Sequence, residues 1–520
     1  MNLKSLIQSR VAKHQNKDFL FYKDESYTYE QLDQITNRVA NAFRSAGITE
    51  ESKVAIMLPN CPEFIFVWFG LAKLGAATVL INTQLSGNFL RRQFIVGDSE
   101  AVVIGARFRA VFNPIVPELG DLKKIVYLSE KDQLGSPDRP DAVSFWDWIN
   151  AFPDAAPPDL ELEDDHPISI MFTSGTTGPS KGVLNGQKAY IRCGADCAEL
   201  LQLNEQDRCY VVLPLYHGNP QMMAVMSALW IGGSLALAER FSASRFFEEA
   251  RKYQATYFTY VGTVLNILCK QPEKLDDGDN PLRLAFGGGA PKNEWRIMEE
   301  RFKVKINEVY GMIEAGCVTT ISPKGEERYG SIGKPRDCFE IRIANERDES
   351  VPCGEVGEIL IRPREPFIMF DGFYNMPEST LKSYRNLWFH TGDKARIDED
   401  GYFYFEGRVK NTIRRKGENI SSEAIEQALN AYPKVLESAV VGVPDDIAGE
   451  EIKAYVIPKE DEVITPEELI DWCREGLPGF MVPRYIEFRK QFEKTGSEKI
   501  RKFKLKEEGI GDAWDLLENK

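Results

Sequence analysis

The chain has 520 residues, of which 43% are hydrophobic and 28% are charged, so it is long enough for about three domains with buried cores. Its formal net charge of −15 argues against a broad nucleic-acid or anionic-membrane surface, because such partners repel an acidic protein. We therefore expect no nucleic-acid partner and no integral membrane segment.

The cysteines and the two ends of the chain predict a cytoplasmic protein. Nine cysteines without a regular spacing favour reduced thiols over disulfides. Cys193 and Cys197 lie four residues apart, but no second pair or nearby histidine completes a zinc site, so we interpret them as core thiols. The N-terminus, MNLKSLIQSR, has no apolar targeting segment, and the C-terminus matches no retention or peroxisomal signal.

The first part of the chain predicts strands that alternate with helices. Leu32, Ile35, Val39 and Phe43 recur at helical spacing before a stop at Gly47. A second helix is predicted over residues 63–74, where Gly75 ends it. Short β-rich runs predict strands at residues 54–58, 77–81, 101–104 and 168–172. Such alternation predicts a parallel sheet covered on both faces.

The alternation continues beyond residue 182. Strands are predicted at residues 209–213, 234–238 and 257–261, and helices at residues 222–231 and 246–252. The uncharged residues 222–238 are slightly short for a membrane span, and Gly232-Gly233 divides them, so they predict a buried helix, a turn and a strand. The pattern predicts one large α/β unit that can consist of two similar subdomains.

The composition changes twice in the second half of the chain. From about residue 336, short runs separated by Gly, Pro and Asp predict a smaller β-rich layer, with strands at residues 339–343, 357–361 and 402–405. After residue 409, a compact α+β domain is predicted, with helices at residues 423–431 and after Thr465, where a capping box begins, and strands at residues 439–443 and 452–457. We therefore predict an N-terminal domain over residues 1–409, with its α/β subdomains reaching about 335, and a C-terminal domain over residues 410–520.

Residues 168–182 read ISIMFTSGTTGPSKG, an apolar run followed by glycines, hydroxyls and one lysine. Glycines let backbone N–H groups approach a polyphosphate closely, and Lys181 adds a point charge. The spacing is not that of a Walker A loop, because Gly182 stands where the magnesium hydroxyl would follow the lysine. A solvated glycine-rich loop is the alternative interpretation.

Five further segments accompany this loop: FGGGAP at residues 286–291, YGMIE at 310–314, WFHTGD at 388–393, GRVKNTIRRKGENISSE at 407–423 and TGSEKIRK at 495–502. In this order and spacing, the six segments resemble the adenylate-forming superfamily of acyl-CoA synthetases, peptide-synthetase adenylation domains and firefly-type luciferases. The resemblance covers residues 28 to about 502. It implies a large N-terminal domain of two α/β subdomains plus a small β-rich subdomain, and a small mobile α+β C-terminal domain.

The resemblance also implies the reaction and its cofactors. A carboxylate attacks the α-phosphorus of ATP to give an acyl-adenylate and pyrophosphate, and a thiol then expels AMP. Both steps move negative charge, so positioned cations and hydrogen-bond donors carry most of the catalysis. Glu314, with the hydroxyl of Thr173, would hold Mg²⁺. The nucleotide-binding positions carried over by the resemblance are Thr173, Ser174, Gly175, Thr176, Thr177, Gly178 and Lys181 for the phosphates; Gly288, Gly289, Ala290, Pro291, Tyr310 and Gly311 for the adenine; and Asp393 and Arg408 for the ribose.

Three residues of the C-terminal part acquire roles in the same way. Lys499, otherwise a solvated lysine of a basic tail, matches the lysine that bridges carboxylate and α-phosphate during adenylation. Lys410 matches the hinge about which the C-terminal domain rotates between half-reactions, and Gly417 would then line the pantetheine channel.

His217, otherwise a core or surface histidine, lies where the family has an active-site wall or orienting group. The glycine-rich loop is expected to loosen at residues 176–180 when pyrophosphate leaves.

The chain departs from the family pattern at three positions. Ile313 replaces a threonine before the glutamate, which removes a phosphate hydrogen bond worth about 1 kcal/mol. Glu498 replaces a glycine directly before Lys499, and Asn411 replaces an aspartate at the hinge. The first two departures leave open a nucleotide-binding protein that has lost catalysis.

The acid and its acceptor are predicted from what surrounds residues 215–218. By the same resemblance, peptide-synthetase adenylation domains anchor the α-amine of their substrate with an aspartate in the segment that matches residues 215–218. No aspartate lies between residues 207 and 276 here, which disfavours an amino-acid substrate. Coenzyme A and a small carboxylic acid are therefore the expected partners. A carrier protein, or oxidation of the acyl-adenylate, is the alternative, and the sequence leaves a homodimer open. The expected pocket segments contain an apolar and aromatic set that favours a fatty or other apolar acid: Tyr216, Met222, Tyr257, Phe258, Tyr260 and Val261.

The stretch INTQLSG at residues 81–87 most resembles the fatty-acyl and carnitine/crotonobetaine CoA ligase branches. A quaternary ammonium acid could use the tyrosines of the pocket set as a partial cage. The leading hypothesis is therefore an AMP-forming acyl-CoA synthetase, with a carnitine- or crotonobetaine-like acid as an alternative substrate.

Overall fold

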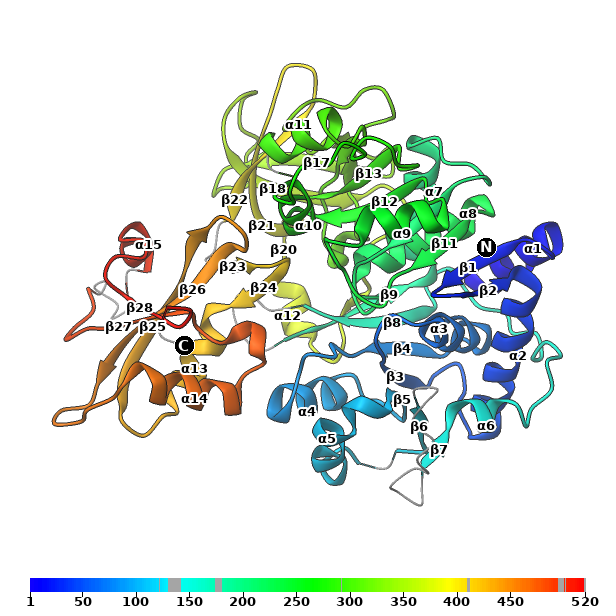
Figure 1. The fold of residues 1–520 in the computed structure, drawn as a ribbon, viewed down its shortest axis with the longest axis horizontal. Coiled ribbons are helices and arrows are strands. Elements are labelled where there is room, and N and C mark those ends of the chain that lie inside the picture. Colours follow the sequence, from blue (N-terminus) through cyan, green and yellow to red (C-terminus); the bar gives the residue numbers. More distant parts are fainter. Residues whose placement is uncertain are drawn as a thin grey trace. The chain divides into compact units, whose positions relative to one another are not determined.

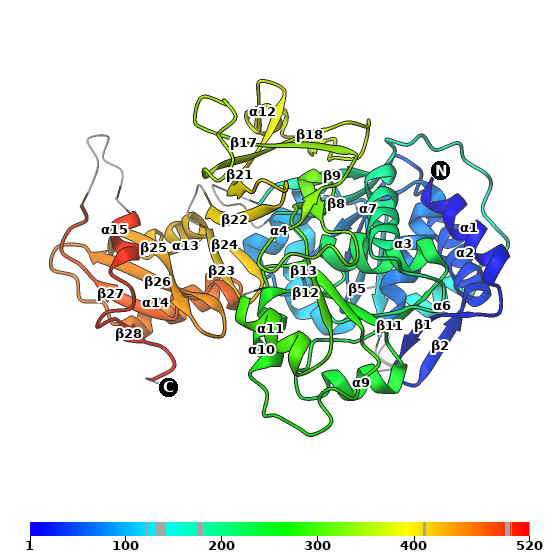
Figure 2. The same cartoon turned by 90° about the horizontal axis from the view of Figure 1, so that it is seen from above.

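The computed structural model describes residues 1–120, 122–129, 142–173, 180–290, 292–408, 412–493, 500 and 502–518. The chain divides into two units, shown in Figures 1 and 2. The first contains residues 1–83, 93–172 and 182–407, and the second contains residues 84–92, 173–181 and 408–520. The predicted boundary between residues 409 and 410 lies outside the described residues.

An eight-stranded sheet contains the strand that leads into the glycine-rich loop. Its order is β19-β9-β8-β4-β3-β5-β6-β7, and the six strands from β8 to β7 run parallel, whereas β9 and β19 are antiparallel to their neighbours. The parallel core confirms the predicted α/β alternation. The strands are β3 (Lys53–Met57), β4 (Ala77–Leu80), β5 (Ala101–Gly105), β6 (Lys124–Leu128), β7 (Ala142–Ser144), β8 (Pro167–Phe172), β9 (Gly182–Gly186) and β19 (Gly372–Phe373).

The two helices that the sequence predicts in this part are confirmed, and five others were not predicted. Helix α2 (Tyr29–Ser45) starts at a capping box between Thr28 and Gln31, and α3 (Pro62–Leu74) ends at Gly75, whose φ of 77° is left-handed. Every residue of α3 except Glu63 is buried, as expected for a helix packed between layers. The remaining helices are α1 (Leu3–His14), α4 (Gly87–Val96), α5 (Arg109–Phe112), α6 (Phe145–Ile149) and α7 (Gln187–Leu200).

A seven-stranded sheet forms the second α/β subdomain. Its order is β14-β13-β12-β10-β11-β1-β2, with all neighbours parallel except the terminal pair β1 and β2. The N-terminal hairpin, which the sequence did not predict, completes this sheet. The elements are β1 (Asp18–Tyr22), β2 (Glu25–Thr28), β10 (Arg208–Val211), β11 (Ser234–Leu237), β12 (Tyr257–Val261), β13 (Leu284–Gly288), β14 (Lys305–Glu308), α9 (Phe246–Tyr253), α10 (Gly262–Cys269) and α11 (Lys292–Glu300).

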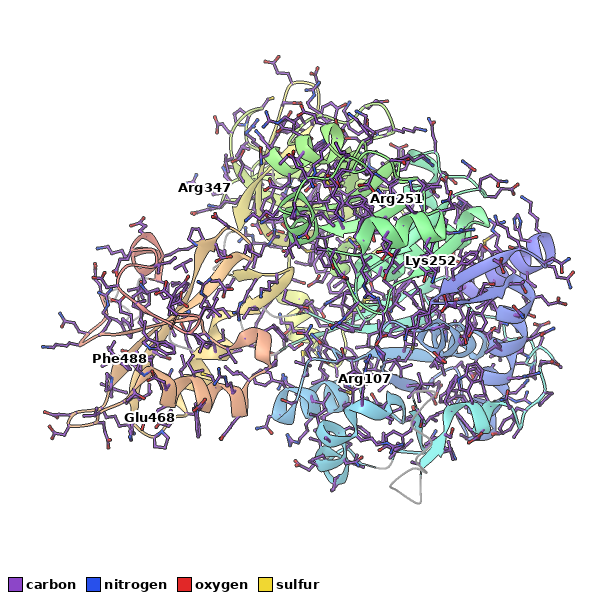
Figure 3. All side chains as sticks on the ribbon, viewed as in Figure 1. Arg107, Arg251, Lys252, Arg347, Glu468 and Phe488 are labelled. Carbon is purple, nitrogen blue, oxygen red and sulfur yellow. The ribbon has the colours of Figure 1, made fainter. Side chains whose placement is uncertain are left out.

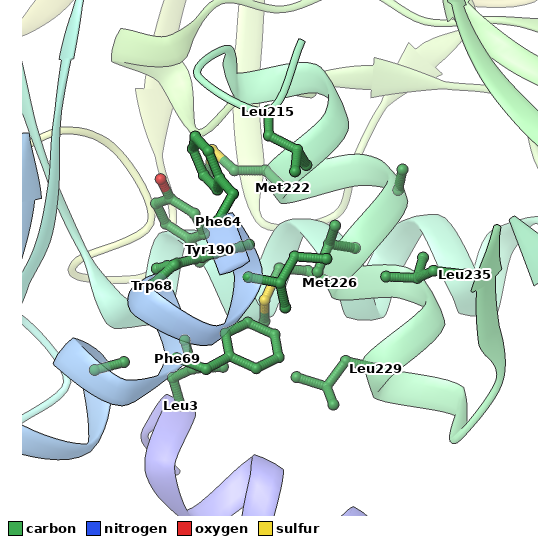
Figure 4. Close-up of a cluster of buried hydrophobic side chains, with 14 of the residues drawn as sticks. Leu3, Phe64, Trp68, Phe69, Tyr190, Leu215, Met222, Met226, Leu229 and Leu235 are labelled. Carbon is green, nitrogen blue, oxygen red and sulfur yellow. The ribbon is translucent and has the colours of Figure 1, made fainter. Parts of the chain in front are cut away.

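The apolar residues 222–238 form a buried helix, a turn and a strand, as predicted. The helix begins as a π-helix (Asn219–Val225) and continues as α8 (Met226–Ile231), and Gly232 then turns the chain into β11. Met222, Met226 and Leu229 pack in the largest hydrophobic cluster, part of which Figure 4 shows. No helix within the described ranges is long and apolar enough to cross a membrane.

The β-rich part and the second unit complete the chain. In the β-rich sheet, β18 lies between β17 and β21, and β21 also pairs with β20 and β22. The second unit is an α+β domain in which β25 and β26 form a long antiparallel pair, and Thr465 caps α14 through the predicted capping box. The elements are β15 (Thr320–Ile321), β16 (Lys334–Pro335), β17 (Phe339–Ala344), β18 (Gly357–Pro363), α12 (Pro377–Lys382), β20 (Tyr384–Arg385), β21 (Trp388–Ile397) and β22 (Phe403–Arg408), followed by β23 (Thr412–Arg415), β24 (Glu418–Ser421), α13 (Ser422–Asn430), β25 (Val435–Asp445), β26 (Gly449–Pro458), α14 (Pro466–Gly476), β27 (Tyr485–Phe488), α15 (Lys502–Glu507) and β28 (Trp514–Asp515).

Candidate active site

Two residues that the sequence assigns to adenine and ribose contact each other directly. The Tyr310 hydroxyl donates a hydrogen bond to Oδ2 of Asp393 at 2.9 Å, and both side chains are buried. Tyr310 follows β14, where its backbone pairs with Thr320. The structure thus brings YGMIE and WFHTGD together at one point of the first unit.

The Asp393 side chain is held by an irregularity in β21. Gly392 has a left-handed φ of 72°, and its N–H donates to Oε1 of Glu358 at 2.9 Å. The Asp393 N–H donates to Oγ1 of Thr391 at 3.1 Å, and that hydroxyl donates to the Ile359 carbonyl at 2.8 Å. Neighbouring groups of β18 and β21 therefore fix the backbone from which Asp393 reaches Tyr310.

The glycines of FGGGAP are required by close backbone approaches. A Cβ at Gly287 would lie 2.1 Å from the Tyr260 carbonyl oxygen, and Gly289 has a left-handed φ of 88°. A Cβ at Gly262, at the start of α10, would lie 1.9 Å from the Gly289 oxygen. The ends of β12 and β13 therefore meet main chain to main chain, which leaves no room for side chains between them.

Glu308 is a site residue that sequence reasoning missed. Its carboxylate accepts hydrogen bonds from the N–H groups of Gly289 and Ala290, the latter at 3.0 and 3.1 Å, and from the Tyr260 hydroxyl at 2.6 Å. Burial, and then the neighbouring Glu308 carboxylate, hold the pKa of Tyr260 well above its usual value, so its hydroxyl remains a donor. The signal was an acidic residue in a short strand, two positions before YGMIE, and that position is buried here.

Ile313 connects YGMIE with the segment that contains His217. A Cβ at Gly218 would lie 2.7 Å from Ile313 Cδ1 and 3.7 Å from both Cys317 Sγ and Met171 Sδ. The predicted threonine position is therefore occupied by an apolar side chain packed on Gly218. Next to it, Glu314 is half-buried, and its carbonyl oxygen accepts from the Phe370 N–H at 3.0 Å.

His217 lies in a turn at the end of the second sheet. Its N–H donates to the Pro214 carbonyl at 3.0 Å, and its half-buried ring lies 4.5 Å from the Tyr216 ring, centroid to centroid. Because Gly218 follows directly, the His217 backbone is adjacent to the contact between Gly218 and Ile313. The structure therefore brings His217, Glu314 and the apolar Ile313 into one neighbourhood.

Most of the expected acid-binding set is wrong. Met222, Tyr257, Phe258 and Tyr260 have no solvent-accessible surface, so they cannot line a pocket open to a substrate. The Tyr257 hydroxyl lies 3.1 Å from Oγ of Ser227, and that of Tyr260 is bonded to Glu308. Neither tyrosine is available for a cage around a quaternary ammonium group. Tyr216 and Val261 retain some accessible surface.

The sequence was compared with known protein families, and two family profiles match it. The profile of the AMP-binding enzyme family matches residues 7–374, and that of the AMP-binding enzyme C-terminal domain matches residues 424–499. The chain belongs to the AMP-binding enzyme family. A crotonobetaine/carnitine–CoA ligase of Citrobacter koseri is 34% identical to it over 522 residues, covering 97% of this chain and 99% of the relative. The Salmonella arizonae ligase of the same name is 35% identical over 491 residues, covering 93% of each chain.

Solved structures agree with this membership. An anthranilate CoA ligase, AuaEII, in complex with anthranoyl-AMP is 25% identical with a TM-score of 0.74, covering 98% of this chain and 97% of its own. The amide bond synthetase McbA from Marinactinospora thermotolerans is 24% identical with a TM-score of 0.86, covering 98% and 99%. The predicted resemblance to adenylate-forming enzymes, its acyl-CoA ligase branch and the fold class are confirmed at the level of the family.

Several predicted nucleotide-binding residues of this AMP-binding enzyme belong to the second unit or lie outside the described residues. The Thr173 N–H donates to the Lys181 carbonyl at 3.0 Å, and the Ser180 hydroxyl donates to the Thr173 carbonyl at 2.7 Å, so the base of the loop is closed. Gly417 has a left-handed φ of 86° in the turn between β23 and β24. Outside the described residues lie Ser174, Gly175, Thr176, Thr177, Gly178, Pro291, Lys410, Asn411, Glu498, Lys499, most of the loop expected to loosen, and the side chain of Arg408.

The described side chains of this AMP-binding enzyme include no preformed cage for a metal. Within the described ranges, no group of three or more His, Cys, Asp or Glu residues could hold an ion. A single half-buried carboxylate such as Glu314 fits Mg²⁺, which keeps its waters and is bound through one or two protein ligands plus substrate phosphates. All nine cysteines are free thiols, and Cys193 and Cys197 are buried on α7, as expected for core residues.

Proposed function

We propose that this protein is an AMP-forming CoA ligase for a short carboxylic acid that carries a quaternary ammonium group. The carboxylate oxygen bonds to the α-phosphorus of ATP, and the bond to the pyrophosphate oxygen breaks. The CoA sulfur then bonds to the acyl carbonyl carbon, its thiol proton is released, and AMP leaves with the former carboxylate oxygen. The hydrogen bond between Tyr310 and Asp393 carries the proposal, because it brings the two nucleoside-binding motifs of the family together.

Each site residue has a role in this proposal. Asp393 accepts hydrogen bonds from the ribose hydroxyls, with Arg408 beside it, and the backbone from Gly288 to Pro291 lies against the adenine, opposite Tyr310 and Gly311. The loop of residues 173–181 binds the departing pyrophosphate. Glu314 and Thr173 would hold Mg²⁺, which would neutralise phosphate charge. Lys499 bridges the carboxylate and the α-phosphate, Lys410 is the hinge, and Gly417 lines the thiol channel.

The size of the acid is inferred from the closed end of the site. Gly262 and Gly289 meet main chain to main chain, and the Tyr257, Phe258 and Tyr260 side chains are sealed in the core. These contacts support a short acid rather than a long-chain fatty acid. Two relatives that share about a third of their residues with this chain are named crotonobetaine/carnitine–CoA ligases, which supports a small quaternary ammonium acid.

A cationic cavity in the first unit supports CoA as the acceptor. A cavity of about 450 Å³ lies beyond the ends of β1 and β11, and Arg107 is labelled in Figure 3. Four cationic side chains and two carboxylates line it, and Lys23 and Arg107 pair with Glu239 while Arg245 pairs with Glu249. The remaining formal surplus of two positive charges, in a protein that is acidic as a whole, would attract the phosphates of CoA. It is lined by Lys23, Arg107, Leu237, Ala238, Glu239, Arg240, Arg245, Glu249 and Tyr253.

The experiment is ATP–pyrophosphate exchange over a panel of acids, followed by thioester detection with and without CoA. The panel contains crotonobetaine, carnitine, butyrate, crotonate and fatty acids of increasing length. We expect exchange with the short quaternary ammonium acids and an acyl-CoA product. Exchange only with long fatty acids would overturn the substrate class, exchange without acyl-CoA would favour a carrier protein, and no exchange with any acid would favour a nucleotide-binding protein without catalysis. A cytoplasmic location and a homodimer stay predictions.

A further inference from the structure

The backbone of Leu213 and Leu215, just before His217, is hydrogen-bonded by side chains and not by a neighbouring strand. Residues 213–217 follow β10 (Arg208–Val211) and pair with no strand, and Pro214 has no N–H to donate. Buried backbone groups in such a segment must be satisfied by other parts of the molecule, because an unpaired buried group costs about as much as a lost hydrogen bond. Leu213 and Leu215 are both buried.

A single side chain supplies two of these hydrogen bonds and a third to the residue after β11. Asn60, in the loop between β3 and α3, is only 4% exposed. Its Oδ1 accepts from the Leu215 N–H at 2.8 Å, and its Nδ2 donates to the carbonyls of Leu213 at 2.9 Å and Ala238 at 3.1 Å. The side chain therefore donates two hydrogen bonds and accepts one, a combination that suits the carboxamide of asparagine or glutamine.

A second amide holds the other side of Leu215. Nε2 of Gln221, at the start of the π-helix, donates to the Leu215 carbonyl at 2.6 Å, and Oε1 of Gln221 accepts from the Tyr190 hydroxyl at 2.9 Å. Tyr190 and Leu215 are labelled in the buried cluster of Figure 4. Both backbone groups of Leu215 are thus bound by side-chain amides, two residues before His217.

We propose that Asn60 is a positioning residue for His217. The loop that contains Asn60 belongs to the eight-stranded sheet, whereas the three groups that it binds belong to the ends of β10 and β11 in the seven-stranded sheet. Asn60 therefore fixes the His217 segment relative to the sheet from which the glycine-rich loop emerges. This inference rests on the proposed function, in which His217 faces the acid and the thiol.

The test substitutes Asn60→Asp, which preserves size but removes both donors. The new carboxylate would face the carbonyl oxygens of Leu213 and Ala238. Leaving a buried carbonyl without its hydrogen-bond donor costs about 1–3 kcal/mol. We expect kcat for acyl-CoA formation to fall at least about ten-fold, which is 1.4 kcal/mol, while KM for ATP stays within about two-fold because the phosphate-binding loop is unchanged. Lowering the pH should protonate the new carboxyl, restore one donor, and recover part of the loss relative to wild type.

Asn280→Asp is a matched control. Asn280 has the same hydrogen-bond pattern, because its Nδ2 donates to two carbonyls, at 2.9 and 3.0 Å, and its Oδ1 accepts from the Leu282 N–H at 3.1 Å. It lies before β13, at the end of that strand opposite to FGGGAP. The control should lose comparable thermal stability and keep its kcat. Equal losses of kcat in both variants would overturn the proposal.

A double-mutant cycle separates positioning from general damage. In a His217→Ala background, Asn60→Asp should cost less than about two-fold, because residues that act through one another are not additive. Retention of the full Asn60→Asp effect in that background would overturn the proposal. If Asn60→Asp does not fold, Asn60→Ala replaces it, since it removes the same hydrogen bonds without burying a charge.

A readout that needs no activity distinguishes failure of this inference from failure of the proposed function. Carbethoxylation of His217 by diethyl pyrocarbonate, followed by mass spectrometry, reports the exposure of that ring directly. We expect its rate to change at least about three-fold in Asn60→Asp and to stay at the wild-type value in Asn280→Asp. An unchanged rate in Asn60→Asp would overturn the positioning role, whether or not the wild-type protein activates any acid.

Discussion

The Tyr310 hydroxyl and the Asp393 carboxylate are joined by a 2.9 Å hydrogen bond across 83 residues of sequence. The two side chains approach from different layers, Tyr310 from the end of β14 and Asp393 from β21 of the β-rich sheet. The ring of Tyr310 also lies 6.2 Å from the ring of Phe405 in β22. A nucleoside bound between these layers would meet a carboxylate already oriented by a protein donor.

Tyr310→Phe tests that orientation. The substitution keeps the ring but removes a hydrogen bond to a charged group, worth about 1.5–3 kcal/mol. We expect KM for ATP in pyrophosphate exchange to rise at least about ten-fold. Tyr404→Phe is the control, because the Tyr404 hydroxyl donates to Asp398 at 3.0 Å in the same sheet. An unchanged KM in Tyr310→Phe would show that the contact does not prepare the ribose site.

Glu308→Gln tests the support of the FGGGAP backbone. The carboxylate accepts from two N–H groups and one hydroxyl, and an amide would turn a donor toward some of them. We expect the unfolding free energy to fall by about 1–3 kcal/mol and KM for ATP to rise, measured by urea unfolding and pyrophosphate exchange. Glu326→Gln, at an exposed position, should change neither quantity. A stable Glu308→Gln protein with normal ATP use would refute this role.

Lys499→Ala tests the two-conformation account that the family resemblance implies. Adenylation should be abolished, whereas conversion of a supplied acyl-adenylate and CoA to the thioester should persist, because the lysine would act only in the first half-reaction. The measurement is each half-reaction by itself. Lys504→Ala, which breaks a 2.6 Å ion pair with Glu493 in the same basic region, should spare both. Equal loss of both half-reactions in Lys499→Ala would contradict the account.

Asp348→Asn tests a pH-dependent contribution to stability. Hydrogen bonds from Arg385, and then from Asn386, lower the pKa of Asp348 from 3.8 to about 2. A carboxyl whose pKa is depressed in the folded state stabilises it above the unfolded pKa, and this stability is lost as the pH falls from about 4 to about 2. The variant should be less stable at neutral pH and lose less on acidification, as urea unfolding at several pH values would show. Asp279→Asn, at an exposed site, should follow the wild-type profile.

The sequence predicted the elements well where local signals and burial agree. Helix α3 ends at Gly75 because only a left-handed residue continues the chain there, and Thr465 begins α14 through a capping box that is visible in four letters. The antiparallel β9 was missed because a strand that starts directly after a glycine-rich loop, with glycine at both ends, resembles the loop itself.

The acid-binding set failed for a physical reason. Tyr257, Phe258 and Tyr260 are successive residues or near neighbours in β12, a central parallel strand covered on both faces. In such a strand both alternating sets of side chains enter the core, so an apolar run carries no information about which residue reaches the substrate. Only positions at or past the end of the strand, such as Val261 and Gly262, border the open edge of the sheet, and the sequence alone cannot locate that edge.

Glu308 and Asn60 show a second kind of contact that the sequence could not predict. Each is a polar residue in an apolar neighbourhood, which indicates a partner but does not identify it. Apart from the Tyr260 hydroxyl on Glu308, their partners named above are backbone groups at Gly289, Ala290, Leu213, Leu215 and Ala238. Because every residue has the same N–H and C=O groups, no pattern of side chains could have predicted these contacts.

The meeting of Gly262 and Gly289 has a consequence for how this enzyme could evolve. A wall made of side chains can be moved by single substitutions, but this wall is peptide backbone, and both of its residues are already the smallest available. No point mutation there can enlarge the space beyond it. In the proposed function, adaptation to longer acids would require insertion or deletion of residues between β12 and α10 or after β13, so descendants of this chain should exchange one compact acid for another far more readily than they acquire lipid substrates.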